Sequence, residues 1–346
     1  MDKQIVFIEK NKAELLDVEG QPLGAKQIRV KTVFSTISNG TERANLTGDP
    51  TIGTNVKPGS PAVFPRRAGY STSGIVVEKG EDVKSFEVGD RVAMYWTTHR
   101  SYNVVNEKNA VKMESDNISF EEASIAHIAT FPLAAIRKTR LEIGESAMVM
   151  GLGILGLLAV GLAHAAGAVP VIAVDPVKER REKALKFGAD YAFDPFEDDF
   201  AEKVKAVTNG GVNAAIEVTG QGAGLNETLD CMARFGRVAL LGCTRNSDFT
   251  VDYYRKVHGP GISLIGAHTL ARPDVESHSG YFTTADDMKA FLKLCANNRI
   301  KVKDIIEETY SPAECTEVYD RLANDKSFPT VVQFDWGRLE VNYEKN

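Results

Sequence analysis

Hydrophobic and polar residues alternate in two different rhythms along this chain. In its first third, short runs of β-favouring residues are separated by glycine, proline and charged residues, and strands are expected at residues 27–32, 74–78 and 90–94. From about residue 119, strand-length apolar runs alternate with helical patterns. The first rhythm indicates a compact, largely antiparallel β domain, and the second a doubly wound α/β sheet of six parallel strands. These six strands are expected at residues 147–150, 171–174, 191–193, 214–218, 238–241 and 262–267.

The pattern changes again after residue 280. It predicts a helix over residues 285–297, a short strand, a second helix over 312–323 and a final strand over 330–334. A completed six-stranded sheet is not easily extended by this tail, so we expect the tail to pack on the first domain. The predicted domains are residues 1–118 with 281–346, which are β-rich, and residues 119–280, which form the parallel sheet.

A glycine-rich turn connects the first two expected parallel strands. Gly151-Leu152-Gly153-Ile154-Leu155-Gly156 follows the first strand and opens a long apolar run, and the second strand ends on Asp175. This G-x-G-x-x-G pattern has the strand–turn–helix–strand–acid context of a dinucleotide site. Gly151 permits the sharp turn, Gly153 lets the backbone approach a pyrophosphate, and Gly156 allows close helix–strand packing. The helix N-terminus supplies N–H groups for the phosphates, so the sequence predicts a bound dinucleotide.

Asp175 indicates which dinucleotide is bound. A carboxylate at the end of the second strand accepts hydrogen bonds from the ribose hydroxyls and repels a 2′-phosphate, which favours NAD(H) over NADP(H). Arg180 and Arg181 follow it, and either is a candidate partner for a 2′-phosphate. We favour the interpretation that both lie on the solvated face of a helix, and we include Arg180 among the expected cofactor contacts.

Bulk properties exclude several classes of partner. The formal net charge of −6 gives no electrostatic reason to expect nucleic acid or an anionic membrane. The longest apolar stretch, residues 154–174, is interrupted by glycine, histidine and proline, so it predicts a buried helix and strand. The four cysteines form no C-x-x-C pair, which favours reduced, mostly buried thiols. The first residues lack a signal-peptide pattern, and we expect a cytoplasmic protein.

Short motifs in a fixed order resemble a known family. They are Gly40-Thr41-Glu42, Gly69 with Gly74-Ile75-Val76, Gly89-Asp90-Arg91-Val92, the glycine turn, Phe187-Gly188-Ala189-Asp190, Glu217-Val218-Thr219-Gly220 and Gly236-Arg237-Val238. Their order is similar to that of the medium-chain dehydrogenase/reductase superfamily, which includes the zinc-type alcohol and polyol dehydrogenases. Variant motifs around residues 37–42, 69–71 and 334–336 look most like the bacteriochlorophyllide a dehydrogenase branch. The resemblance implies a GroES-like catalytic domain built from both chain ends and a Rossmann domain between them.

The chain departs from this family at its zinc ligands. Zinc-dependent members carry cysteine where this chain has Asn39, histidine where it has Tyr70, and cysteine or glutamate near Phe131. The structural-zinc loop with its four cysteines is also missing between residues 90 and 112. Because a catalytic zinc needs three protein ligands, the sequence predicts no bound metal. The alternative is a relocated site formed by Glu42, His99 and His127, although a histidine in an apolar run such as His127 is more often a packing residue.

Without zinc, other side chains must handle the substrate's proton. The resemblance places Thr41 where relatives keep a relay hydroxyl, and Tyr70 where they keep the metal-binding histidine. A positioned phenol can act as a general acid, and His127 or Glu42 would connect this relay to solvent. Tyr70 as a plain pocket wall remains an open alternative, and for Glu42 we favour a capping or salt-bridging role. Tyr95, Trp96 and His99 are expected near a pocket edge.

Further cofactor contacts follow from topology, because ligands of such sheets lie at the carboxyl ends of the strands. The resemblance adds Thr130, which matches a family threonine near the nicotinamide carboxamide. The expected contacts beyond Gly151, Gly153, Gly156, Asp175 and Arg180 are Thr130, Ile154, Leu155, Val218, Thr219, Gly242, Cys243, Gly266, Ala267 and His268.

These observations predict a zinc-independent, NAD-dependent dehydrogenase that acts on a secondary alcohol or ketone: a polyol, a sugar derivative or a bulky ring alcohol. One alternative is an enone or quinone reductase, a class that usually prefers NADPH. Another is a catalytically silent NAD(H)-binding protein. Relatives pair the strand at residues 262–267 with its two-fold copy, so a homodimer or homotetramer is expected.

Overall fold

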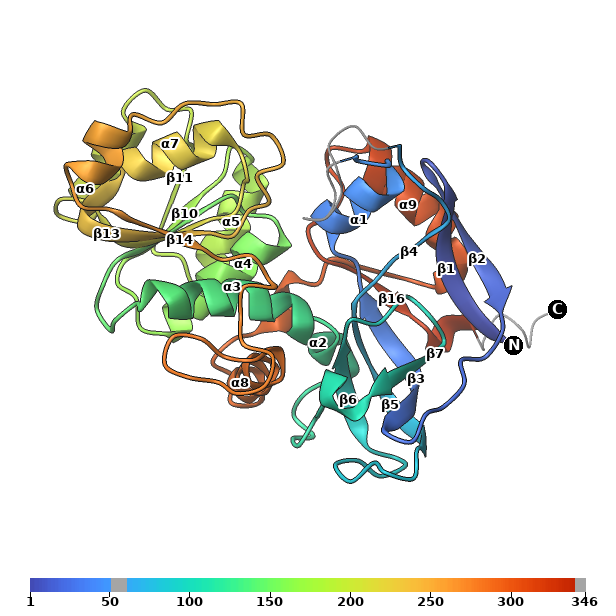
Figure 1. Cartoon of the computed structure of the whole chain (residues 1–346). Coiled ribbons are helices and arrows are strands. Elements are labelled where there is room, and N and C mark those ends of the chain that lie inside the picture. Colours follow the sequence, from blue (N-terminus) through green and yellow to red (C-terminus); the bar gives the residue numbers. More distant parts are fainter. Residues whose placement is uncertain (51–60, 340–346) are drawn as a thin grey trace. The chain divides into compact units, whose positions relative to one another are not determined.

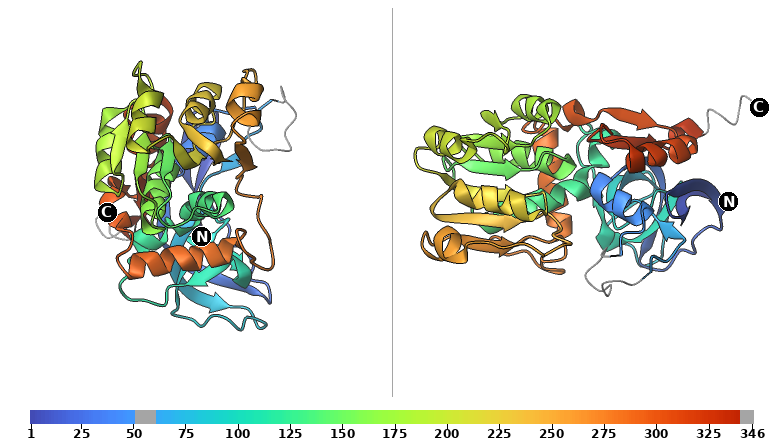
Figure 2. Two further views of the ribbon diagram at one scale, coloured as in Figure 1. Left: turned by 90° about the vertical axis from the view of Figure 1, so that its left-hand side faces the viewer. Right: turned by 90° about the horizontal axis from the view of Figure 1, so that it is seen from above.

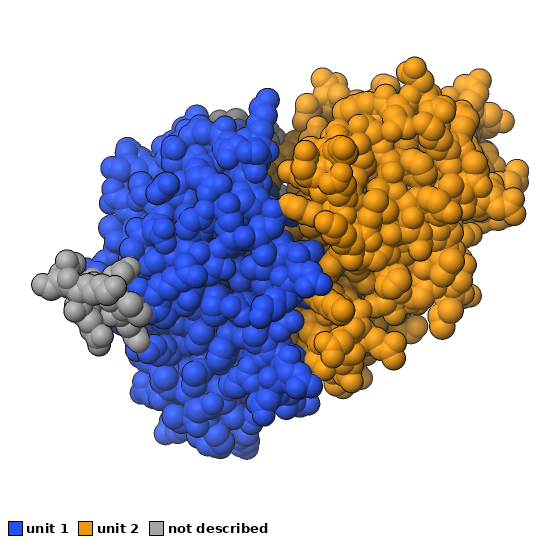
Figure 3. Space-filling model, turned by 180° about the vertical axis from the view of Figure 1, so that it is seen from behind, with its two compact units in different colours: residues 1–128, 302–346 blue, residues 129–301 orange. Residues whose placement is uncertain are grey.

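The computed structural model describes residues 1–50 and 61–339, and the chain divides into two compact units. One unit combines both chain ends, Met1–Ile128 and Val302–Asn346, and the other is Ala129–Lys301 (Figure 3). Within the described residues, no helix is long and apolar enough to span a bilayer.

The unit built from both chain ends contains two sheets (Figure 1). A three-stranded antiparallel sheet has the order β2-β1-β4, and a larger sheet has the order β15-β16-β3-β5-β6-β8, with β7 also paired to β3. In the larger sheet, all strand pairings are antiparallel except that of β15 with β16. The strands are β1 (Asp2–Glu9), β2 (Lys12–Val18), β3 (Gln27–Thr36), β4 (Arg66–Arg67), β5 (Ser71–Lys79), β6 (Arg91–Tyr95), β7 (Tyr102–Asn106), β8 (Ala110–Lys112), β15 (Glu308–Tyr310) and β16 (Val332–Asp335).

Helices α1 (Asn39–Leu46), α2 (Phe120–Ala123) and α9 (Cys315–Asn324) belong to this unit, with short 3₁₀ turns at Glu107–Asn109, Val302–Ile305 and Pro312–Glu314. In α9, Val318, Tyr319 and Leu322 are buried at the i, i+1 and i+4 positions of one face. The Tyr319 ring meets the Phe7 ring at 4.8 Å between centroids, so the two ends of the chain share one core.

The other unit is built on a six-stranded sheet in the order β11-β10-β9-β12-β13-β14, and every pairing is parallel. The order reverses at β9, and helices cover both faces (Figure 2). The strands are β9 (Ala147–Met150), β10 (Val171–Val174), β11 (Tyr191–Phe193), β12 (Val212–Glu217), β13 (Met232–Leu240) and β14 (Ser263–Gly266). The helices are α3 (Ala126–Thr139), which enters from the first unit, α4 (Ile154–Ala165), α5 (Lys178–Lys186), α6 (Phe200–Val207), α7 (Gly222–Asp230), a π-helical turn (Tyr254–His258) and α8 (Thr284–Ala296).

The predicted fold class is confirmed, and β9, β10 and β11 have the expected bounds. The boundaries of the compact units differ from the expected ones at both junctions. Helix α8 lies in the parallel-sheet unit, because its Asp287 is fully buried and pairs with Arg137 at 2.7 Å and Arg272 at 3.4 Å. Helix α2 lies in the other unit, where the hydroxyl of Ser73 donates to the Phe120 carbonyl at 2.5 Å.

Candidate active site and cofactor site

The glycine turn between β9 and α4 has the geometry of a phosphate site. Gly151 has a φ of +96°, which favours glycine. A Cβ on Gly156 would lie 1.8 Å from the Gly151 carbonyl oxygen, so only glycine fits where the helix begins. A Cβ on Gly153 would meet no protein atom within 4 Å, which leaves open space beside the N-terminus of α4. The turn therefore offers a close approach for an anionic group.

Asp175 lies beside this turn at the end of β10 and is only 3% exposed. Its carboxylate accepts hydrogen bonds from the Leu152 amide at 2.8 Å and the Val177 amide at 2.9 Å. The Arg180 guanidinium lies 3.5 Å from the same carboxylate. Arg181 instead donates to the Asp175 carbonyl at 2.7 Å and pairs with Asp194 at 3.2 Å. Arg181 therefore holds the strand end, and Arg180 is the arginine beside the Asp175 carboxylate.

The loops after β12 and β13 meet at the same edge of the sheet. A Cβ on Gly242 would lie 2.3 Å from the Gly220 nitrogen, and a Cβ on Gly151 would lie 3.0 Å from Thr219 Cγ2. The expected contacts Val218, Thr219, Gly242 and Cys243 are thus brought together with the glycine turn, as parallel topology requires. Cys243 is exposed.

Glu217 organises the loop after β12, a role that the sequence reasoning missed. It is 2% exposed and accepts hydrogen bonds from the Thr219 amide at 2.7 Å, the Thr219 hydroxyl and the Gly220 amide at 3.2 Å. Burial raises the pKa of Glu217, and the bonds from Thr219 and Gly220 oppose that rise. An acid at a strand end followed by Thr-Gly was the available signal.

Two basic residues tie the segment after β14 to α3. Lys138 Nζ donates to the Gly266 carbonyl at 3.1 Å, and burial lowers the pKa of this lysine. Arg272 donates to the Thr130 carbonyl at 2.8 Å and to the Thr269 carbonyl at 3.0 Å. Arg272 therefore links Thr130 to the segment that follows Gly266, Ala267 and His268. Nothing in the sequence pattern distinguished Lys138 or Arg272 from surface cations.

In the unit of both chain ends, an aromatic cluster surrounds His127. The His127 ring centroid lies 5.3 Å from that of Tyr70, 5.5 Å from that of Tyr95 and 4.6 Å from that of Trp96. His127 Nδ1 donates to the Tyr70 carbonyl at 2.8 Å, and the Tyr70 phenol donates to Ser38 Oγ at 2.5 Å. Trp96 is 45% exposed and has a φ of +56°, a strained conformation for a bulky residue.

Glu42 lies in a buried network that adjoins this cluster through Ser38. Its carboxylate accepts hydrogen bonds from the Ser38 amide at 2.9 Å, His99 Nε2 at 3.1 Å and the Tyr319 phenol at 2.5 Å. Burial and the neighbouring Glu42 raise the pKa of Tyr319 well above its ordinary value. These contacts favour the interpretation of Glu42 as a structural anchor. Thr41 lies beside it in the first turn of α1 and is half-buried.

The residues at the family's zinc positions do not fit that metal. The Asn39 amide nitrogen donates to the Pro329 carbonyl at 2.8 Å and the Thr330 carbonyl at 3.2 Å, so it anchors α1 to the chain before β16. Tyr70 and Phe131 offer neither thiolate nor imidazole. Across residues 1–50 and 61–339, no three His, Cys, Asp or Glu side chains are grouped to hold a metal, which argues against a relocated site formed by Glu42, His99 and His127.

The cysteines are free thiols: Cys231, Cys295 and Cys315 are buried, and Cys243 is exposed. Burial raises the pKa of Cys231 to about 12 and that of Cys315 to about 11. These two thiols are therefore protonated at neutral pH.

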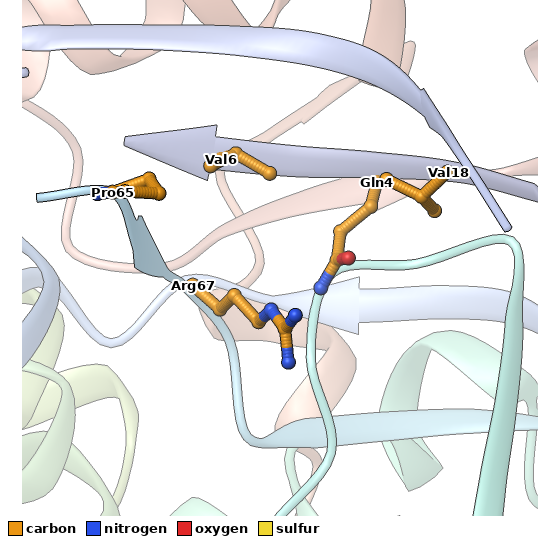
Figure 4. Close-up of a pocket in the computed structure, with 5 residues that line it drawn as sticks. All are labelled: Gln4, Val6, Val18, Pro65 and Arg67. Carbon is orange, nitrogen blue, oxygen red and sulfur yellow. The ribbon is translucent and has the colours of Figure 1, made fainter. Parts of the chain in front are cut away.

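A separate hollow of about 500 Å³ lies against β1, β2 and β4 (Figure 4). It is lined by Gln4, Val6, Val18, Pro65 and Arg67. Arg67 is the one charged side chain among these lining residues, so the hollow lacks an acid–base pair. None of the predicted site residues lines it.

Comparisons with known proteins identify the family. Residues 24–138 match the alcohol dehydrogenase GroES-like domain, and residues 155–279 match the zinc-binding dehydrogenase family. The L-threonine 3-dehydrogenase of Pyrococcus horikoshii is 30% identical over 298 residues, which cover 77% of this chain and 83% of that protein. The chain belongs to the medium-chain dehydrogenase/reductase superfamily. The predicted resemblance is confirmed, and the protein is an alcohol dehydrogenase-like oxidoreductase.

Two other proteins match this dehydrogenase over more of its length. The D-guloside 3-dehydrogenase of Escherichia coli K12 is 24% identical over 334 residues, covering 92% of this chain and 95% of that protein. The crystal structure of 2R,3R-butanediol dehydrogenase from Bacillus subtilis has a TM-score of 0.81 at 22% identity, covering 97% of this chain and 99% of that one. This structural match supports the assigned fold class over nearly the full length of the chain.

Proposed function

We propose that this dehydrogenase transfers a hydride between NAD(H) and a small secondary alcohol or ketone without zinc. The observation that carries the proposal is Tyr70: a phenol stands at the position of the family's zinc-binding histidine, with its oxygen held by Ser38 at 2.5 Å. The Asn39 amide at a second ligand position is committed to backbone carbonyls. Proton handling therefore falls to side chains of this chain.

NAD(H) is the cofactor that the parallel-sheet unit suits best. The glycine turn offers space for the pyrophosphate beside the N-terminus of α4. The Asp175 carboxylate is fixed by two backbone amides, where it would accept the ribose hydroxyls and repel a 2′-phosphate. This choice of cofactor also argues against the NADPH-preferring reductases.

When held by the glycine turn and Asp175, the nicotinamide cofactor would supply the hydride chemistry. When a ketone is reduced, Tyr70 donates its phenolic proton to the substrate oxygen. When an alcohol is oxidised, the Tyr70 phenolate takes the proton of the substrate hydroxyl, and the hydride leaves the carbon atom that bears this hydroxyl. Thr41, in the first turn of α1, is the second hydroxyl that we assign to the proton path.

The substrate that we propose is a cyclic polyol or sugar derivative. The E. coli relative that matches most of the chain is a dehydrogenase of a guloside. Trp96 is partly exposed next to Tyr70, at 5.8 Å between ring centroids. An aromatic face of this kind packs against the C–H face of a ring alcohol, while hydroxyl-bearing side chains orient its oxygens.

The test is to screen NAD with cyclic polyols, sugars and glycosides, and then to compare wild type with Tyr70→Phe on the substrate found. We expect the turnover of Tyr70→Phe to fall by roughly 10²–10⁴-fold, because the ring remains and the proton donor is lost. NADH affinity should be unchanged. Tyr102→Phe, in β7, is the matched control and should retain turnover. Activity should also survive a chelator.

Each contrary result has a distinct meaning. Wild-type turnover in Tyr70→Phe would move the proton role to His127. Stoichiometric zinc that is lost together with activity would overturn the zinc-free mechanism. Tight NADH binding with no turnover across the panel would support the silent binding protein.

A further inference from the structure

Ser38 occupies a helix-capping position without capping the helix. It precedes α1, is 5% exposed, and its side chain makes no hydrogen bond to the first turn. Serine is among the preferred N-cap residues, and its cap bond typically contributes about 1 kcal/mol. The hydroxyl is directed instead to the phenol of Tyr70, 32 positions along the chain, at 2.5 Å.

The backbone around Ser38 is held firmly. Its amide donates to the Glu42 carboxylate at 2.9 Å, and its carbonyl accepts from the Glu42 amide at 2.8 Å. On one side, the Ile37 amide donates to the Val332 carbonyl at 3.0 Å; on the other, the Asn39 side chain is bonded to residues before β16. Ser38 Oγ therefore has a fixed position from which to place the phenol.

We propose that Ser38 is a positioning residue that holds the Tyr70 phenol and stabilises its deprotonated form. This inference rests on the proposed role of Tyr70. When Tyr70 is protonated, its O–H donates to Ser38 Oγ. When Tyr70 has given its proton to the substrate oxygen, the Ser38 O–H rotates and donates to the phenolate. Ser38 keeps its own proton throughout, so the reaction's proton balance is unchanged.

Titratable groups reach Tyr70 from several elements. His127 on α3 bonds to its carbonyl, and Glu42 on α1 is connected to it through the Ser38 amide. His99 packs against Gly69, the residue before Tyr70, because a Cβ on Gly69 would lie 2.6 Å from the backbone nitrogen of His99. The Glu42 carboxylate is already bonded to His99 and Tyr319. At the phenol oxygen, the hydroxyl of Ser38 accepts the hydrogen bond from Tyr70.

The experiment compares Ser38→Ala, Ser38→Thr and the control Ser73→Ala. Ser73 lies in β5, and its buried hydroxyl donates to the Phe120 carbonyl, so its removal costs a hydrogen bond away from Tyr70. Ionisation of Tyr70 is read from tyrosinate absorbance against pH, by subtracting the same variant carrying Tyr70→Phe. This readout requires no substrate, and the pH dependence of kcat on the identified substrate is the second readout.

We expect Ser38→Ala to move the ionisation midpoint of Tyr70 upward by about one pH unit, a tenfold change that one hydrogen bond to a charged oxygen readily supplies. The pH profile of kcat should move by the same amount, with NADH affinity unchanged. Ser38→Thr should restore both midpoints, and Ser73→Ala should leave them in place. If Ser38→Ala does not fold, Ser38→Cys keeps the size, weakens the donor and should shift the midpoint in the same direction.

Unchanged midpoints in Ser38→Ala, with turnover still lost in Tyr70→Phe, would overturn this inference and leave the proposed function standing. Wild-type turnover in Tyr70→Phe would overturn the proposed function, and Ser38 would then have no role in positioning a proton donor.

Discussion

Asp175 is the residue that we expect to decide the cofactor choice. We expect NADH to bind at least ten times more tightly than NADPH, because a 2′-phosphate would be placed against a carboxylate that is 3% exposed. Tenfold corresponds to about 1.4 kcal/mol, which repulsion between a 2′-phosphate and a buried carboxylate readily supplies. Fluorescence titration of both cofactors measures the ratio. Equal affinities in wild type, with a preference for NADH appearing in Arg180→Ala, would show that Arg180 overrides Asp175.

At the scale of single residues, sequence reasoning was strongest where a residue acts through its own backbone conformation or its place at a strand end. Gly151 and Asp175 are of this kind. For Glu42 it favoured a capping or salt-bridging role but could not name the partners, because the buried contacts with His99 and Tyr319 join positions 57 and 277 residues apart. Tertiary packing brings such partners together, and the pattern of neighbouring residues in the sequence does not predict them.

At the scale of elements, Gly153 and Gly156 have different roles in the turn between β9 and α4. Gly156→Ala would place a Cβ 1.8 Å from a backbone oxygen, so we expect a loss of stability of about 1–3 kcal/mol or more. Its unfolding temperature without cofactor should therefore fall by several degrees, and NADH binding should weaken. Differential scanning calorimetry and titration measure the two effects.

Gly153→Ala is the matched comparison. Its Cβ would meet no protein atom within 4 Å, and its φ of −69° suits alanine. The unfolding temperature should remain unchanged while NADH affinity falls, because the added methyl group occupies the space that we assign to the pyrophosphate. A Gly153→Ala variant with full affinity would show that the pyrophosphate does not lie against this residue.

At the scale of the whole molecule, β14 is an edge strand of the six-stranded sheet, with no further strand paired to it among the described residues. Leu264 on this strand is 38% exposed. An open apolar edge favours pairing with a second copy, and two-fold closure is the commonest arrangement. We expect a dimer, or a tetramer built from such dimers, by light scattering at micromolar concentration. Leu264→Lys should weaken the assembly, whereas Leu270→Lys, outside the strand, should not. A wild-type monomer would contradict this expectation.

Local order was readable from the sequence by itself. The start of β3, the bounds of β9, β10 and β11 and the glycine turn were predictable because strand patterns, turn chemistry and helix initiation depend on neighbours in the chain. Together they determined the fold class and predicted which edge of the sheet binds the nucleotide.

The tertiary structure alone decided which distant side chains meet. It placed α8 with the parallel sheet through the burial of Asp287 between Arg137 and Arg272. It also turned the hydroxyl of Ser38 away from its own helix and onto Tyr70. A buried charge or hydroxyl bonds to whichever partner packing brings within about 3 Å, and that partner is set by the whole fold rather than by the residues beside it.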